Sequence, residues 1–94
     1  MEYKLCTKFK DRLIGNCFKK EIKKILVFPK CNSIHTFFMR IPIDIIILNK
    51  DKEIIYIKKN LKPWRILLPK KRGYYTIEYP AGSTKYNLNE KIEF

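Results

Sequence analysis

Hydrophobic positions along this chain fall into short runs separated by polar residues, a pattern that is typical of β-strands. The clearest run is Ile43 to Leu48, and a second β-branched run, Glu53 to Lys58, follows after the polar residues 49–52. Two such runs around a four-residue polar tip predict a β-hairpin. Because the first run is apolar on both of its faces, we expect it to be an internal strand of a sheet.

Shorter runs on either side complete the prediction of a mainly β fold. A segment with helical spacing lies near the N-terminus, between a capping Thr7 and a terminating Gly15, and one helical turn is expected over 84–89. Several short strands with few helices favour a small β-barrel or β-sandwich. Further strands are predicted at 3–6, 25–29, 65–68, 74–79 and 91–94.

The length and composition are those of one folded domain. The chain has 94 residues, of which 46% are hydrophobic and 14% aromatic, so residues 1–94 are expected to form a single domain with its own core. The net charge is +12, which raises the question of a polyanionic partner. Lysine dominates over arginine, and arginine is the residue that base-specific recognition favours. We therefore discount the charge as a mainly solvated lysine surface.

Cysteine spacing and the N-terminal residues indicate the cellular compartment. Cys6, Cys17 and Cys31 are odd in number and form no C-x-x-C pair, so free thiols in a reducing compartment are expected. Cys31 and His35 are four residues apart, but the sequence offers no clear further pair of zinc ligands, and we predict no metal or cofactor. The first ten residues carry charges where a signal peptide would be apolar, and no run is long enough to span a membrane. We expect a cytoplasmic monomer.

Several blocks of the sequence together resemble one known family. These blocks are DRLIG at 11–15, LVFP at 26–29, HTFFMRIPIDIIILNKD at 35–51, NLKPWR at 60–65 and IEYPAGS at 77–83. In their residues and their order along the chain, these blocks are similar to the signature blocks of the family of domains of unknown function numbered 192. The resemblance covers nearly the whole chain. It implies a compact β-barrel-like fold with a short helix near its start and no agreed activity.

The chain departs from the family pattern in two places. The hairpin tip usually contains a glycine where this chain has Lys52, so a left-handed backbone or a different turn is expected there. The family's usual Gly-Leu-Met is replaced by Gly15, Asn16 and Cys17. The predicted helix is therefore expected to end differently from that of its relatives.

Asp44 is the residue that most strongly suggests a site, because it interrupts an isoleucine run in an internal strand. A carboxylate at such a position must be paired or hydrogen-bonded. It could fix the fold through backbone N–H groups or an arginine, or it could face a ligand. The predicted pocket is accordingly formed by residues that could gather around it: His35, Met39, Arg40, Asp44, Trp64 and Arg65.

Function is less well determined than fold. No nucleophile elbow, phosphate-binding loop or zinc-protease motif is present, so a binding or accessory module for a small ligand or a protein is favoured over an enzyme. The alternative is nonspecific binding of nucleic acid through a lysine-rich surface. Exposed aromatic residues beside the lysines would favour this alternative, and a concave pocket open at Asp44 would favour a small ligand or catalysis. The candidate cations are Lys58, Lys59, Lys62, Lys70, Lys71 and Arg72.

Overall fold

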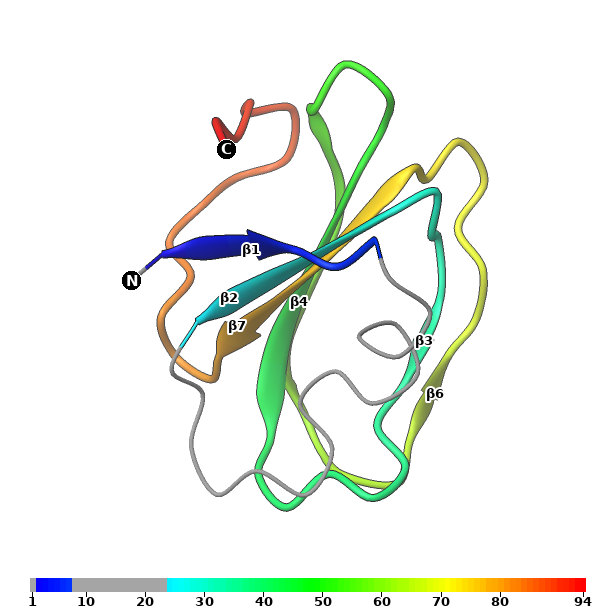
Figure 1. Cartoon of the computed structure of the whole chain (residues 1–94), viewed down its shortest axis with the longest axis vertical. Coiled ribbons are helices and arrows are strands. Elements are labelled where there is room, and N and C mark those ends of the chain that lie inside the picture. Colours follow the sequence, from blue (N-terminus) through cyan, green and yellow to red (C-terminus); the bar gives the residue numbers. More distant parts are fainter. Residues whose placement is uncertain (1, 8–23) are drawn as a thin grey trace.

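The computed structural model describes residues 2–7 and 24–94, and every regular element in that part of the chain is a β-strand (Figure 1). The mainly β prediction is confirmed. Apart from Thr7, the helix predicted over 7–15 lies outside the described residues, as does the departure at 15–17. The strands are β1 Tyr3–Leu5, β2 Ile25–Pro29, β3 Ile34–His35, β4 Ile43–Leu48, β5 Ile54–Leu61, β6 Ile66–Leu67 and β7 Tyr75–Pro80.

Five of these strands form one sheet in the order β1-β2-β7-β4-β5. β1 and β2 are parallel, whereas the other neighbouring pairs are antiparallel. The predicted hairpin is confirmed as β4 and β5, and all six residues of β4 are buried between β5 and β7. β5 continues to Leu61, beyond the predicted end at Lys58. It can do so because it is an edge strand whose Lys58 and Lys59 are exposed to water.

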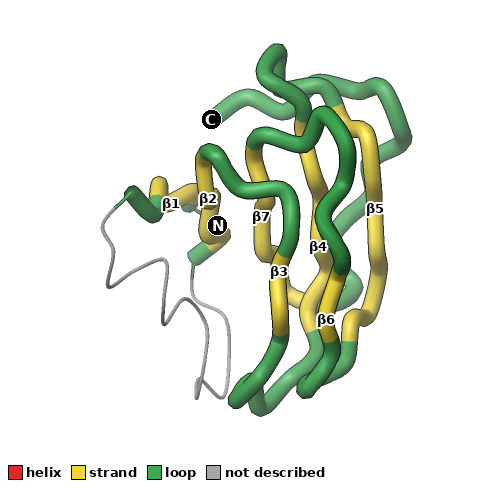
Figure 2. Tube along the Cα trace, turned by 90° about the vertical axis from the view of Figure 1, so that its right-hand side faces the viewer, coloured by secondary structure: helices red, strands yellow, loops and turns green. Residues whose placement is uncertain are grey.

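The remaining strands, β3 and β6, pair into a two-stranded ribbon that lies over one face of the large sheet (Figure 2). Leu67 of this ribbon packs with Ile43, Ile45 and Ile47 of β4. The other face of β4 belongs to a second apolar cluster that contains Ile77 of β7. The described residues therefore form a sandwich-like arrangement of two sheets, and the large sheet does not close into a barrel.

Two of the smaller predicted elements are wrong. Residues 84–89 form no helical turn, because Thr84 is hydrogen-bonded to Asp44 and the Asn89 N–H donates to the Ile54 carbonyl. The last four residues form an isolated bridge from Lys91 to Glu53 in place of a strand, although Ile92 is buried in the core. The described residues include no helix that could cross a membrane.

Lysines occupy left-handed backbone positions that normally favour glycine. Lys52 at the hairpin tip has a φ of 64°, so the left-handed backbone expected there is confirmed. Lys30, which follows β2, has a φ of 55°. A lysine in this region is strained by its Cβ, whereas glycine is not.

Replacing exposed Lys30 by glycine should raise the free energy of unfolding by about 0.5 kcal/mol, since the relief of strain exceeds the entropy cost of glycine. Lys24→Gly is the matched control, because Lys24 is also exposed and is not among the residues with positive φ. It should lower stability slightly. Urea titration of both variants would refute the strain argument if Lys30→Gly lost as much stability as Lys24→Gly.

Candidate functional site

Asp44 is fully buried and accepts hydrogen bonds on both of its carboxylate oxygens. The ladder between β4 and β5 shifts register between Ile43 and Ile45, which frees the N–H of Asn60, and Asp44 Oδ1 accepts that N–H at 2.9 Å. Oδ2 accepts the Thr84 hydroxyl at 2.7 Å and the N–H groups of Gly82 and Thr84 at 3.1 and 3.4 Å. The carboxylate thus joins a bulge in β5 to the turn after β7.

The six residues of the predicted pocket do not share one face of the sheet. Met39 is buried in the cluster of Ile43, Ile45 and Ile47. Asp44 alternates with these isoleucines along β4, so its side chain points to the opposite face. The hydrogen bonds described above come from backbone N–H groups, which are one of the alternatives that the sequence left open, and from Thr84. Arg40, His35 and Arg65 are not among these donors. Those three residues are exposed, together with Trp64.

His35, Phe37, Phe38 and Trp64 form a cluster of rings, which we call the aromatic platform. The His35 and Phe37 rings stack with centroids 4.9 Å apart and planes at 29°. The Trp64 ring lies 5.8 Å from Phe37 and 4.8 Å from Phe38. Phe38 and Trp64 are 50% and 55% exposed, and their rings lie against each other, so they form a continuous apolar surface. The platform therefore presents a connected set of ring surfaces to solvent.

Buried Thr36 holds the two halves of the platform together, although they are far apart in the sequence. Its hydroxyl donates to the Lys62 carbonyl at 2.7 Å and accepts the Arg65 N–H at 2.8 Å. Its backbone N–H donates to the Arg65 carbonyl, and its carbonyl accepts the N–H of Trp64 at 2.9 Å. These bonds extend the pairing of β3 with β6 and fix the loops that carry the rings.

Two exposed rings of the platform sit on strained backbone. Phe38 has a φ of 64° and Trp64 a φ of 63°. Bulky residues rarely adopt this region, and each such position costs about 1 to 3 kcal/mol and persists only where the surrounding structure holds it in place. The hydrogen bond from the Trp64 N–H to the Thr36 carbonyl holds the backbone of Trp64 in this conformation. Strain of this kind often occurs at functional sites, but five other described residues that are not glycine, Lys30 and Lys52 among them, also have a positive φ.

Some of the exposed cations lie beside the platform, and others lie elsewhere on the molecule. Arg40, Lys62 and Arg65 are exposed on the loops that build it, and Arg65 Nη1 lies 3.5 Å from the Pro63 and Trp64 carbonyls. Lys58 and Lys59 are exposed in the half of β5 that pairs with the start of β4. These residues put positive charge at the platform end of the sheet.

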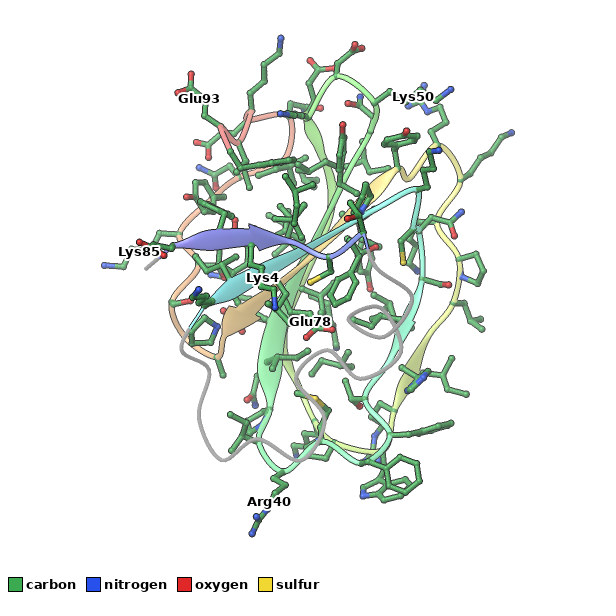
Figure 3. The ribbon with its side chains drawn as sticks, in the orientation of Figure 1. Lys4, Arg40, Lys50, Glu78, Lys85 and Glu93 are labelled. Atoms are coloured by element: carbon green, nitrogen blue, oxygen red, sulfur yellow. The ribbon has the colours of Figure 1, made fainter. Side chains whose placement is uncertain are left out.

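The other three predicted cations lie towards the opposite end of β4, near the hairpin tip. Lys70, Lys71 and Arg72 precede Tyr74, whose N–H donates to the Leu48 carbonyl. Arg72 and Lys50 line an open hollow of about 370 Å³ there, and Lys70 Nζ lies 4.3 Å above the Tyr56 ring. Figure 3 shows Arg40 and Lys50 projecting from opposite ends of the molecule. The six predicted cations therefore do not form one patch.

Sequence reasoning identified His35 and Trp64 but missed the neighbours that make them a surface. Phe37 and Phe38 look like core residues in a chain this rich in apolar runs. No signal in the sequence separated them from core residues, because adjacent apolar residues also occur in the fully buried run Ile43–Leu48. The positive φ values could not be foreseen, since neither residue is a glycine or asparagine.

Comparison with known sequences connects the whole of this architecture to one family. The family model DUF192, described as "Uncharacterized ACR, COG1430", matches residues 1–91. A UPF0127 protein of Pyrococcus horikoshii is 37% identical over 101 residues, covering 99% of this chain and 87% of that protein. A UPF0127 protein of Pyrococcus furiosus is 36% identical over 88 residues, and the alignment covers 87% of this chain and 74% of that protein.

Two crystal structures share the fold. A Novosphingobium aromaticivorans protein of unknown function has a TM-score of 0.73 at 20% identity. The superposition covers 85% of this chain and 63% of that protein. A Sinorhizobium meliloti protein described as a "putative transcription regulator" has a TM-score of 0.72 at 18% identity, with coverages of 85% and 68%. Identities this low show a common fold only. The match over residues 1–91 and the closely similar UPF0127 proteins establish that this chain belongs to the DUF192 family, whose function is uncharacterised.

Proposed function

We propose that this protein binds single-stranded nucleic acid, with little sequence preference, through the aromatic platform. The observation that carries the proposal is the exposure of the Phe38 and Trp64 rings, which pack against each other, on the same loops as Arg40, Lys62 and Arg65. Every base has a π-face that can stack on an aromatic side chain, and each such contact is worth about 1 to 3 kcal/mol. Nearby cations attract the phosphates, and the net charge of +12 favours the encounter.

The geometry gives less support to the polar pocket around Asp44. A ligand-facing carboxylate would be open to water, whereas this one is fully buried and its oxygens accept hydrogen bonds from Asn60, Gly82 and Thr84. Contacts to phosphates carry no sequence information and every base can stack on a ring, so the expected binding is sequence-tolerant. A strand that stacks its bases on the platform would place its backbone beside the three cations.

The test is fluorescence anisotropy of a labelled twelve-residue oligothymidine, with a duplex of the same length as its control. Single strands should bind more tightly than the duplex, in which the bases are already stacked. The logarithm of the affinity should fall with the logarithm of the salt concentration with a slope of about −2, if about three phosphates are contacted. Equal binding of duplex and single strand would contradict the proposal. So would binding to anionic phosphatidylserine vesicles without binding to the oligonucleotide.

A cytoplasmic location is part of the same proposal. Cys31 is a half-buried free thiol, which is typical of a protein kept in a reducing compartment. Single-stranded nucleic acid is also found inside the cell. We propose further that the protein acts as a monomer, because one chain carries the whole platform. Cell fractionation and sedimentation at several protein concentrations test these two points.

A further inference from the structure

A second hollow lies on the other side of the large sheet, away from the aromatic platform. Its volume is about 370 Å³, which is within the range of small-molecule sites. Tyr79 of its lining belongs to the apolar cluster of Ile46 and Leu48, opposite the face that the β3–β6 ribbon covers. The residues that line the hollow are Tyr3, Ile25, Tyr79, Pro80, Ser83 and Tyr86. None of them takes part in the function proposed above.

Three phenol groups meet in this hollow. The Tyr3 and Tyr79 hydroxyl oxygens are 3.0 Å apart, and the Tyr3 and Tyr79 rings pack edge to face. Burial raises the pKa of Tyr79, and hydrogen bonding to Tyr3 raises the pKa of Tyr86, so both phenols stay protonated at neutral pH. The hydrogen bond between Tyr3 and Tyr79 uses only one of their two O–H protons. At least one O–H is therefore left to donate to a bound molecule.

The wall of the hollow is fixed by the buried carboxylate of Asp44. Ser83 lines the hollow, and its two neighbours Gly82 and Thr84 are both bound to Asp44 Oδ2. The Ser83 hydroxyl donates to the Pro80 carbonyl at 2.6 Å, which leaves its oxygen as an acceptor. A wall held in this way needs little rearrangement to receive a ligand, so less of the binding free energy is lost to ordering.

We propose that this hollow binds an uncharged, ring-bearing molecule that carries a hydrogen-bond acceptor. The described residues that line it include no aspartate, glutamate, lysine or arginine, and the charge of Glu90 near Tyr86 disfavours an anion. The phenol rings and Ile25 supply apolar surface for a ring, and the spare phenol O–H supplies the donor. Either an aryl ketone or a sugar ring meets this description, and the experiment must separate the two.

The experiment is a ¹H–¹⁵N NMR titration of the whole chain with acetophenone, benzoate and glucose as separate probes. Acetophenone and benzoate share a ring but differ in charge. At least one neutral probe should shift the amide signals of Tyr79, Gly82 and Ser83, and benzoate should bind there at least tenfold more weakly. Whether acetophenone or glucose binds identifies the kind of ring. Equal shifts at these residues with benzoate, or none with either neutral probe at 20 mM, would overturn the proposal.

Variants then test the role of the hydroxyls. Tyr3→Phe/Tyr86→Phe removes the two half-buried phenol O–H groups but keeps their rings, and it should weaken binding of the neutral probe at least tenfold. Tyr74→Phe/Tyr75→Phe is the matched control, because these half-buried phenols lie outside the hollow and should have no effect. Ser83→Trp, at an exposed position on the rim, should block binding even if the double variant folds poorly. Unchanged binding in Ser83→Trp would exclude the hollow as the site.

Discussion

Asp44→Asn should lower the free energy of unfolding by about 2 to 4 kcal/mol. Both carboxylate oxygens accept hydrogen bonds in a fully buried setting, from Asn60 on one side and from Gly82 and Thr84 on the other. An asparagine has only one acceptor oxygen, so its NH₂ group must face at least one of these donors. Bonds to a charged acceptor are worth more than neutral ones, and a buried donor without a partner is costly.

Asp51→Asn is the matched control for this change. Asp51 is exposed in the hairpin tip, and its backbone N–H donates to Asn49 Oδ1 at 2.9 Å, a bond that the substitution leaves intact. The control should change stability by only a few tenths of a kcal/mol. Urea titration of both variants measures the difference. A loss in Asp44→Asn no larger than in Asp51→Asn would show that the carboxylate does not hold the β5 bulge and the 80–84 turn together.

Trp64→Gly should weaken binding of single-stranded oligothymidine about 10- to 100-fold without lowering stability. The substitution removes the ring that contacts both Phe37 and Phe38, and stacking on such a ring is worth about 1 to 3 kcal/mol per base. It also relieves a backbone with a φ of 63° that glycine adopts freely. A variant that is at least as stable as the native protein but binds poorly would identify the residue as functional.

Leu88→Gly is the control for the loss of an exposed apolar side chain. Leu88 is 56% exposed in a loop that carries no part of the platform. It should leave oligonucleotide binding unchanged, whereas Phe38→Gly should reproduce the effect of Trp64→Gly. Anisotropy measures the binding, and thermal melting measures the stability. If Trp64→Gly and Leu88→Gly bind the oligothymidine equally well, the proposal that bases stack on the platform is wrong.

The central hairpin could be predicted because its signals are local. The β-branched run 43–48 fixes both faces of β4, and the polar residues 49–52 fix the turn. The special position of Asp44 could be predicted for the same reason, since isoleucines surround it. The hydrogen-bond partners of Asp44 could not be predicted, because Asn60, Gly82 and Thr84 come from distant segments and donate mostly through backbone groups.

The aromatic platform shows the opposite case. The sequence singled out His35 and Trp64 by their residue type alone, but the side chains around them depend on the pairing of β3 with β6. That ribbon has two residues in each strand, too few for an alternating pattern to be recognised. Its loops are shaped by Thr36 hydrogen bonds that connect segments almost 30 residues apart. Exposure of the rings is therefore a tertiary property that composition and periodicity do not carry.

The most direct test of the proposed function is to map which residues an oligonucleotide contacts. A ¹H–¹⁵N NMR titration of the native chain with an eight-residue oligothymidine reports this through the Trp64 indole N–H and the backbone amides. We expect the largest shifts at Trp64, Phe38 and Thr36, with smaller ones at Arg40 and Lys62. Shifts confined to the lysines of the 70–72 loop, with the Trp64 indole signal unmoved, would contradict the platform as the binding surface.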